Sequence, residues 1–449
     1  MVKQCLLISF LISYVVVGAQ DVDAAKQAAR QYVQLFAANN FEQLVAAGDS
    51  TMQRKADKET LEGLWESLVL SHGNYQQLME TRVAVYQENY ITVSVIKFEK
   101  RKVGFQLTLN KQLQIAGVFL VAAEEKHQVA DYVKTEKFYE LKIPIAHKKY
   151  PTQGVLSLPK TSAKVPLVIL VHGSGAIDKD CSIGPNKIYK DLAWGMAAKG
   201  IAVFRYDKRT FLHLKQLLAD NQSGEKAFDV RNEYVEDVKA IIALLSKRKE
   251  VDQSQVYLMG HSEGGYLIPL FNQRFKSLAG FVALAGTLRQ IPELALEQMD
   301  YLTPDSLSEK DQAQLLFIKQ SAQNALAENI KPTMPDSLVM QPFPTNYWVY
   351  LKTYQPQQLA LKINKPLLVL QGERDYQVKM KDFGLWKSTL SGKPNASFLS
   401  YPQLNHLFLA GEGASTPAEY LVAANVPEYV INDVVQWITT NKTARALRK

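Results

Sequence analysis

The sequence predicts an α/β protein with a doubly wound, mostly parallel sheet, preceded by a small α+β domain. The first observation is a series of continuous apolar runs that alternate with helical stretches beyond residue 140, as strands buried on both faces do. The second is a block of helices followed by strands of alternating hydrophobicity in residues 24 to 130. The third is the pentapeptide Gly260-His261-Ser262-Glu263-Gly264, which lies between an apolar strand and an apolar helix.

Length and composition exclude several classes. A chain of 449 residues is long enough for two or three domains, and 47% apolar with 21% charged residues is ordinary for a globular protein. The net charge of +8 is spread thinly, and no basic stretch is interleaved with aromatic residues, so no nucleic-acid partner is expected. No His-Glu-x-x-His, paired-cysteine or phosphate-binding motif is present, so neither a metal nor a cofactor is expected. The oligomeric state is left open.

Residues 1–19 predict a cleaved signal peptide. Lys3 precedes an apolar run from Cys5 to Val17, and a small-residue cleavage site ends at Ala19. The run is too short to cross a bilayer, so no membrane span is expected. Cleavage would leave Cys181 as the only cysteine, and an exported chain without an internal disulfide fits a secreted or periplasmic bacterial protein.

Residues 20–130 predict the α+β domain. The apolar spacing within Lys58 to Ser71 is that of an amphipathic helix. Four period-2 segments follow, and helices on one face of such a meander make an α+β unit. The segment carries no catalytic motif, so a binding or positioning role is expected. The predicted strands are Thr81 to Tyr86, Tyr90 to Phe98, Val103 to Leu109 and Gln114 to Val121.

Residues 131–449 predict the parallel sheet. It opens with an antiparallel pair, Tyr139 to Ile145 and Gly154 to Pro159, and a helix over Asp229 to Leu245 crosses over before the serine motif. The remaining predicted strands are Leu167 to Val171, Ile201 to Tyr206, Val256 to Met259, Phe281 to Ala285, Leu367 to Leu370 and Ser397 to Tyr401.

An insertion of about 288–356 separates two of these strands. It contains a predicted helix opening at Ser308, a proline-rich loop and the aromatic residues Tyr347, Trp348 and Tyr350. An insertion at this place is expected to fold as a helical cap over the carboxyl ends of the strands. The aromatic residues are expected to enclose a small, mostly apolar pocket there.

The pentapeptide around Ser262 is typical of a nucleophile elbow, a strand that turns at once into a helix. Gly260 and Gly264 lack the Cβ atoms that would collide at such a turn. Ser262 would then lie at a helix N-terminus, where the free N–H of Glu263 can bind an oxyanion. The Glu263 carboxylate would oppose that oxyanion unless its side chain points away.

A serine nucleophile needs a base and a group that orients the base. In this strand-to-helix arrangement the chain order is serine, acid, histidine. Asp375 follows the strand that ends at Leu370, with Glu373 as a weaker candidate for the acid. His406 is the only histidine after Ser262, which makes it the candidate base.

The second oxyanion donor is expected in His172-Gly173-Ser174-Gly175, directly after a predicted strand. We favour the backbone N–H of Ser174, with Gly173 or Gly175 as the alternatives, and expect His172 to be structural. Asp207, Lys208 and Arg209 are expected to form a structural ion pair beneath the active-site loops.

These stretches together resemble the α/β-hydrolase superfamily, and within it secreted esterases and serine-aminopeptidase-like members. Residues 24 to 130 resemble the small cystatin-like, or nuclear-transport-factor-like, domain that precedes the catalytic domain in some secreted bacterial hydrolases. The resemblance implies Ser262 as nucleophile, Asp375 as acid and His406 as base. The matching stretches are His172 to Gly175, Ile201 to Arg209, Gly260 to Gly265, Gly372 to Asp375 and Asn405-His406.

The resulting hypothesis is an exported serine hydrolase that cleaves small carboxylic esters through an acyl-enzyme. A peptidase or aminopeptidase of the same fold is one alternative. A non-catalytic substrate-binding protein is an alternative from another class, although such proteins usually lack one member of the triad.

Overall fold

The computed structural model describes residues 19–86, 89–121, 123, 127–225, 227–303 and 309–446. The predicted leader lies outside these residues except for Ala19, and the predicted helix start at Ser308 also lies outside them. The chain divides into a smaller unit, Met1–Lys126 with Tyr420–Ala423, and a larger unit, His127–Glu419 with Ala424–Lys449.

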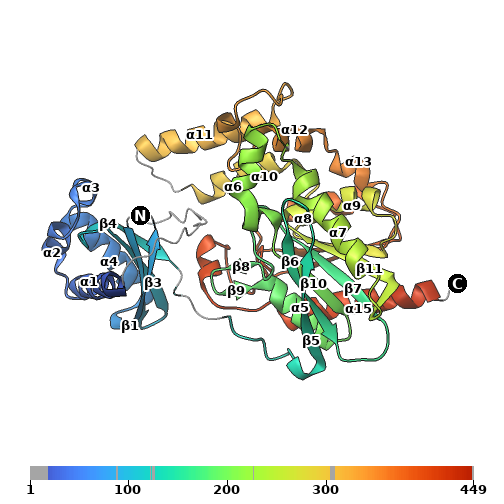
Figure 1. Ribbon diagram of the computed structural model, residues 1–449, viewed down its shortest axis with the longest axis horizontal. Helices are drawn as coiled ribbons and strands as arrows, with labels where there is room; N and C mark the ends of the chain where they lie inside the picture. Colours follow the sequence, from blue (N-terminus) through green and yellow to red (C-terminus); the bar gives the residue numbers. More distant parts are fainter. Residues whose placement is uncertain are drawn as a thin grey trace. The chain divides into compact units, whose positions relative to one another are not determined.

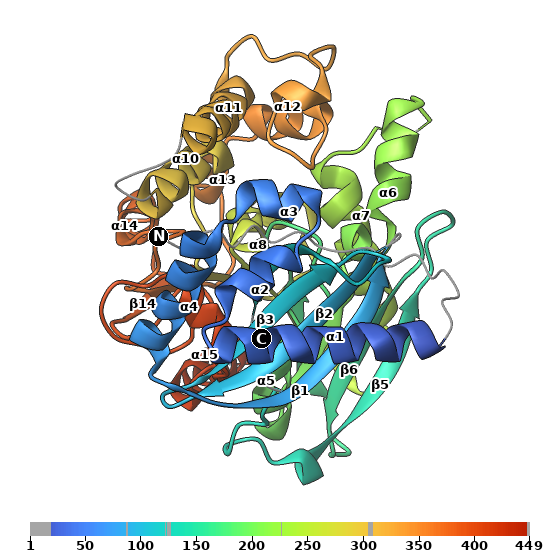
Figure 2. The ribbon, with the colours of Figure 1, turned by 90° about the vertical axis from the view of Figure 1, so that its left-hand side faces the viewer.

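The smaller unit is an antiparallel sheet in the order β1-β2-β3-β4 with helices packed on it, which is the predicted α+β class. Helix α1 lies across the strands (Figure 2). The core is aromatic: the Phe36 ring centroid lies 4.9 Å from that of Phe105 and 5.6 Å from that of Trp65. The elements are α1 (Ala19–Ala37), α2 (Phe41–Ala46), α3 (Ser50–Lys55), α4 (Lys58–His72), β1 (Tyr75–Tyr86), β2 (Asn89–Phe98), β3 (Lys102–Leu109) and β4 (Ile115–Val121).

The larger unit is built on an eight-stranded sheet in the order β14-β13-β12-β11-β7-β10-β6-β5 (Figure 1). Strand β6 is antiparallel to both of its neighbours, and the other adjacent strands are parallel. This is the predicted mostly parallel, doubly wound sheet. Its strands are β5 (Phe138–Ile145), β6 (Thr152–Pro159), β7 (Val165–Val171), β10 (Ala202–Tyr206), β11 (Val251–His261), β12 (Gly280–Leu284), β13 (Leu367–Gly372) and β14 (Ala396–Tyr401).

Burial explains why the central strands read as continuous apolar runs. Every residue of β7, β10, β12 and β13 is buried, because helices cover both faces of the sheet. The predicted helix over Asp229 to Leu245 begins instead with a π-helical turn, Arg231–Val235. The helices are α5 (Ile188–Ala198), α6 (Arg209–Gln222), α7 (Glu236–Leu245), α8 (Glu263–Tyr266), α9 (Ile268–Arg274), α14 (Met380–Thr389) and α15 (Glu428–Ala446), and the short elements are β8 (Ser182–Ile183), β9 (Asn186–Lys187) and the 3₁₀ turns Thr135–Lys137 and Pro417–Leu421.

The insertion between β12 and β13 is helical, as predicted, and its helices gather at one end of the sheet (Figure 1). The ring of Tyr301 stacks on that of Tyr376 with centroids 5.1 Å apart, and Gln298 Nε2 donates to Gln377 O over 3.1 Å. The insertion therefore contacts the loop that follows β13. Its elements are α10 (Ile291–Leu302), α11 (Glu309–Leu326), the 3₁₀ turn Asp336–Leu338, α12 (Thr345–Thr353) and α13 (Pro356–Ala360).

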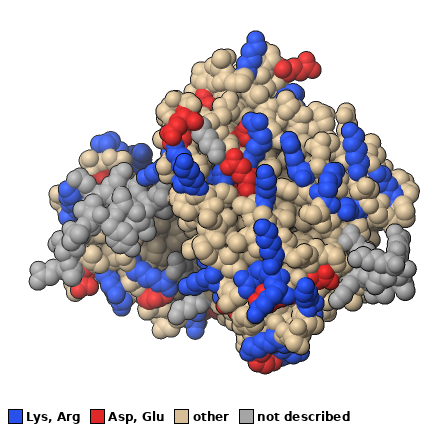
Figure 3. Space-filling model, turned by 45° about the vertical axis from the view of Figure 1, so that its right-hand side comes forward, with Lys and Arg blue, Asp and Glu red and all other residues tan. Residues whose placement is uncertain are grey.

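The surface charge of the larger unit is mixed. On the face shown in Figure 3, Lys and Arg side chains are spread widely, with Asp and Glu side chains between them. Within the described ranges, no helix combines the length and the apolar character that crossing a bilayer requires.

Candidate active site

Ser262 lies at the sharp turn between β11 and α8. Its backbone has φ 54° and ψ −116°, a strained conformation for a residue with a side chain, which costs on the order of 1–3 kcal/mol. A Cβ on Gly260 would lie 2.2 Å from Gly264 O, and one on Gly264 would lie 2.4 Å from Val171 O. Only glycine fits at either position, as the pentapeptide predicts.

Asp375 and His406 are joined by a short hydrogen bond. His406 Nδ1 lies 2.7 Å from Asp375 Oδ2, and because an ionised carboxylate only accepts, the imidazole donates from Nδ1. Gln371 Nε2 also donates to Oδ2, while the backbone N–H groups of Gln377 and Val378 donate to Oδ1. The carboxylate is thereby fixed, and Nε2 of His406 is left with a lone pair that can accept a proton.

Glu373, the alternative acid, lies elsewhere. Its side chain is exposed and accepts a hydrogen bond from Ser400 Oγ over 2.7 Å. Asn405, next to the histidine, shapes the loop, because its Oδ1 accepts from the backbone N–H groups of Leu407 and Leu409.

His261, the residue before the serine, contacts the candidate base. The two imidazole centroids are 4.7 Å apart, and His261 Nε2 lies 2.8 Å from His406 O. Burial and the neighbouring His406 lower the pKa of His261 to about 3, so its ring is neutral near pH 7. Because a carbonyl only accepts, the neutral ring donates from Nε2 and fixes the backbone of His406.

His406 therefore lies beside the turn that carries Ser262. Among the described residues, Ser262 Oγ makes no hydrogen bond to His406. In the absence of substrate, the hydrogen bond between a nucleophile and its base is often long or unformed.

The loop after β7 lies against the serine. A Cβ on Gly173 would be 3.0 Å from Ser262 Cβ and 3.6 Å from Ser262 Oγ. Lys208 Nζ donates to Gly173 O over 2.9 Å and to Gly175 O over 3.0 Å. Gly173 C=O and Ser174 N–H belong to one peptide group, and in a trans peptide they point in opposite directions. The hydrogen bond to Gly173 O therefore also fixes the direction of the Ser174 N–H.

The Glu263 side chain is buried and bound by three hydroxyl groups. Its Oε2 lies 2.7 Å from Ser174 Oγ and 3.0 Å from Tyr234 Oη, and its Oε1 lies 2.7 Å from Tyr347 Oη. These contacts fix the direction in which the carboxylate points, which the sequence left open.

The prediction that Tyr347, Trp348 and Tyr350 enclose a pocket is wrong. Tyr347 and Trp348 are buried, with the Tyr347 ring stacked on Phe343 at 4.4 Å. Tyr350 lies instead beside the Arg231 guanidinium, 5.3 Å from its carbon. Cap helix α12 packs into the core of the larger unit. The spacing of the aromatic residues in the sequence does not show whether their side chains point into a pocket or into the core.

The expected ion pair among residues 207 to 209 is also different. Asp207 Oδ2 accepts from Gln153, Lys208 pairs with Glu233 at 2.9 Å, and Arg209 pairs with Asp237. Lys208 does lie beneath the loop after β7, as expected, but its partner Glu233 was not predicted from the sequence.

His172 has a structural environment, as expected. It is buried and donates from Nε2 to Tyr206 O over 2.5 Å. Burial lowers the pKa of His172 to about 3, so the ring is neutral near pH 7.

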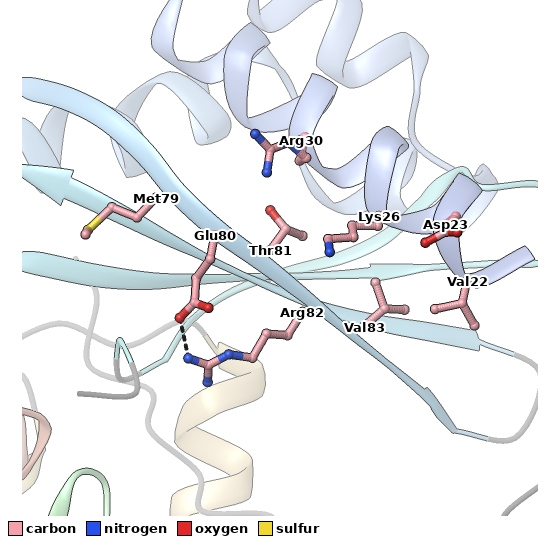
Figure 4. Close-up of a pocket in the computed structure, with 9 residues that line it drawn as sticks. All are labelled: Val22, Asp23, Lys26, Arg30, Met79, Glu80, Thr81, Arg82 and Val83. Carbon is pink, nitrogen blue, oxygen red and sulfur yellow. Dashed lines mark hydrogen bonds and ion pairs between the residues drawn. The ribbon is translucent and has the colours of Figure 1, made fainter. Parts of the chain in front are cut away.

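The smaller unit carries a separate cavity of about 450 Å³ between α1 and β1 (Figure 4). Figure 4 shows Lys26 and Arg30 on α1 near Thr81 of β1, while Glu80 and Arg82 form an ion pair. The lining combines charged residues of both signs with the apolar Val22, Met79 and Val83, and no triad candidate belongs to it. The lining residues are Val22, Asp23, Lys26, Arg30, Met79, Glu80, Thr81, Arg82 and Val83.

The fold and the elbow define an α/β hydrolase, and the comparisons agree. Residues 165–412 match the family model described as "Serine aminopeptidase, S33", and residues 29–118 match a family of unknown function, DUF3887. The chain is similar to Esterase EstD of Thermotoga maritima, with 32% identity over 432 residues that cover 96% of this chain and 98% of that protein. The chain belongs to the serine aminopeptidase (S33) family of α/β hydrolases.

Solved structures are similar at lower identity. Est1E from Butyrivibrio proteoclasticus has 17% identity and a TM-score of 0.44, covering 67% of this chain and 99% of that one. The acylaminoacyl peptidase of Pyrococcus horikoshii has 15% identity and a TM-score of 0.43, covering 74% and 52% respectively.

Proposed function

We propose that the protein is a serine esterase that cleaves small carboxylic esters through an acyl-enzyme. An esterase-type α/β hydrolase is the class to which the fold, the family and the full-length similarity to an esterase assign it. One observation carries the mechanism: Asp375 binds His406 Nδ1 at 2.7 Å, beside an elbow with Ser262 at its apex.

In the proposed first half-reaction, His406 Nε2 takes the proton of Ser262 Oγ as this oxygen attacks the ester carbonyl carbon. Asp375 holds the imidazole in the required tautomer and stabilises the imidazolium. The N–H groups of Glu263 and Ser174 bind the oxyanion, with Gly173 as the neighbouring alternative. The imidazolium then gives its proton to the departing alkoxide, and the acyl group stays on Ser262.

In the second half-reaction, His406 takes a proton from water, whose oxygen attacks the acyl carbon. The oxyanion is bound by the same N–H groups. Collapse of this intermediate releases the carboxylic acid and returns the proton to Ser262 Oγ. The reaction consumes one water and needs no other reactant.

The substrate preference gives the first prediction. The insertion contacts the loop that carries Asp375 through α10, where the Tyr301 ring stacks on that of Tyr376, and this supports a covered site for short acyl groups. In an open apolar groove each further methylene would add up to about 0.8 kcal/mol. We therefore expect kcat/KM across nitrophenyl esters to be highest for short chains, whereas a maximum at long chains would contradict a covered site.

A peptidase is the second candidate, because the matching family is described as a serine aminopeptidase. Aminoacyl nitroanilides compared with nitrophenyl esters distinguish the two, because correction for uncatalysed hydrolysis removes the intrinsic difference between amine and oxygen leaving groups. We expect esters of the same acyl group to be cleaved faster after correction for their uncatalysed hydrolysis. Faster cleavage of the anilides would make peptide bonds the preferred substrate.

We also infer that the protein is exported, from the sequence of residues 1–19. The N-terminus of the mature chain is then expected at Gln20. N-terminal sequencing after expression with export machinery measures it. A mature chain that retains residues 1–19 would contradict export by cleavage.

A further inference from the structure

A cluster of five buried side chains lies behind the proposed oxyanion loop; we call it the carboxylate cluster. The side chains come from four parts of the site: the loop after β10, the π-helical turn, which supplies two of them, the elbow and the cap. Glu263 belongs to it and directly follows Ser262, so the cluster is adjacent to the reacting atoms without containing any of them. Its members are Lys208, Glu233, Tyr234, Glu263 and Tyr347, all 2% exposed or less.

The hydrogen bonds around Tyr347 require an extra proton. Its Oη lies 2.8 Å from Glu233 Oε2 and 2.7 Å from Glu263 Oε1. Burial and the two carboxyl groups raise the pKa of Tyr347 well above its usual value, so the phenol keeps its proton. One phenol proton can satisfy only one of two carboxylates, so one carboxyl group must bring a proton of its own.

The contacts of the two carboxyl groups differ. Lys208 Nζ and Thr210 Oγ1 both lie 2.9 Å from Glu233 Oε1, which leaves Oε2 to carry a proton toward Tyr347. Glu263 faces hydroxyl donors at both oxygens, which suits the ionised form. Burial raises the pKa of Glu233 and the charge of Glu263 raises it further, against the opposing effect of Lys208.

This assignment also balances the buried charge. Protonated Glu233 is neutral, so the positive Lys208 is balanced by the negative Glu263. Two ionised carboxylates with one ammonium would leave a net buried charge, which is costly in a low-dielectric interior.

We propose that Glu233, Tyr347 and Glu263 form a directed chain of hydrogen bonds through which the cap positions the oxyanion loop. Glu233 donates to Tyr347, Tyr347 donates to Glu263, and Glu263 accepts from Ser174 Oγ. These are positioning residues, and the inference rests on the proposed function.

The cluster holds the loop at three points. Glu263 accepts from Ser174 Oγ over 2.7 Å, and Lys208 Nζ donates to Gly173 O over 2.9 Å and to Gly175 O over 3.0 Å. Because Tyr347 belongs to α12, the position of the cap affects the orientation of the Glu263 carboxylate. The oxyanion donors are then aligned only when α12 is packed so that Tyr347 contacts Glu263.

The directed hydrogen bonds from Glu233 through Tyr347 to Glu263 predict that kcat falls at alkaline pH. Below the raised pKa of Glu233 its proton is present and the chain is complete. As the pH rises through that pKa, Glu233 ionises and two carboxylates face a single phenol proton, so both the stabilisation and the alignment are lost. The polar and titratable groups around Glu233 are Lys208, Thr210, Tyr347, Glu263 and the phenols of Tyr206 and Tyr234.

Two isosteric substitutions test the direction of the chain. In Glu233→Gln the amide can donate to Tyr347 while its carbonyl accepts from Lys208 and Thr210, as the protonated acid does. We expect kcat to stay within about twofold and the alkaline fall to disappear. In Glu263→Gln the amide can donate to Tyr347 only if Tyr347 donates to an ionised Glu233 instead, which reverses the hydrogen bonds and removes the negative charge beside Ser174. We expect kcat to fall about tenfold to a hundredfold, with KM little changed.

Tyr347→Phe removes the bridge, and we expect a similar fall in kcat at unchanged KM. Tyr350→Phe is the matched control, since it makes the same change on the same helix outside the cluster, and it should leave kcat unchanged. Melting temperatures establish that each variant is folded. If Glu263→Gln does not fold, the kcat of Tyr347→Phe and the pH profile of Glu233→Gln together test the proposal.

The proposal would be overturned if Glu263→Gln kept the wild-type kcat while Glu233→Gln lost it. An unchanged kcat in Tyr347→Phe would overturn it as well. Labelling of the wild-type enzyme with a fluorophosphonate separates this failure from that of the proposed function. If the wild-type enzyme is labelled and turns over substrate, and the variants have the same kcat, only the proposed hydrogen bonds are refuted. A wild-type enzyme that does neither refutes both.

Discussion

Replacing Ser262 with alanine is expected to lower kcat for ester hydrolysis by roughly a thousandfold to a millionfold. The change removes the proposed attacking oxygen and leaves the elbow glycines in place. The residual rate would come from the remaining oxyanion donors and substrate binding. The measurement is kcat with a short-chain nitrophenyl ester, together with the melting temperature.

Ser254→Ala is the matched control for this loss. Ser254 lies toward the other end of the same strand, β11, and is exposed. Its loss should leave kcat within about twofold, because surface substitutions away from special features have small effects. Retention of more than about a tenth of wild-type kcat in Ser262→Ala would rule the serine out as nucleophile.

Asp375→Asn is expected to lower kcat on the order of ten-thousandfold. An amide at this position can donate to Nδ1, which favours the tautomer that carries its proton on Nε2 and cannot accept one from Ser262. Gln371 Nε2 would also lose its acceptor, while the backbone N–H groups of Gln377 and Val378 keep the remaining carbonyl oxygen.

Glu373→Gln provides the comparison, since Glu373 is the other carboxyl group of the same loop. Its partner is Ser400, and it makes no contact with His406 among the described residues. The substitution should have almost no effect on kcat. A loss in Glu373→Gln that matched the loss in Asp375→Asn would contradict the assignment of the acid.

The sequence allowed the sheet and the elbow to be predicted because both leave local signals. Strands covered on both faces must be apolar at successive positions, as β7 and β13 are. The elbow needs glycine where a Cβ would strike the backbone, as at Gly260 and Gly264. The single histidine after Ser262 identified the candidate base by elimination.

The carboxylate cluster could not be predicted in the same way. A glutamate that is fully buried looks in sequence like one on a solvated surface, and the contact of Glu233 with Tyr347 joins residues 114 positions apart. The direction of Tyr347 depends on the same packing. Aromatic side chains near a site suggest a pocket wall, but here the phenol binds two carboxyl groups inside the core.

The most direct test of the account is the location of the covalent adduct that a fluorophosphonate forms with the active enzyme. After labelling to completion, the protein is digested and the phosphonyl group is located by mass spectrometry. The account predicts one adduct per chain, on Ser262, that appears at least a thousandfold more slowly in His406→Ala. An adduct on another residue, or an enzyme that hydrolyses esters at its full rate without any adduct, would contradict it.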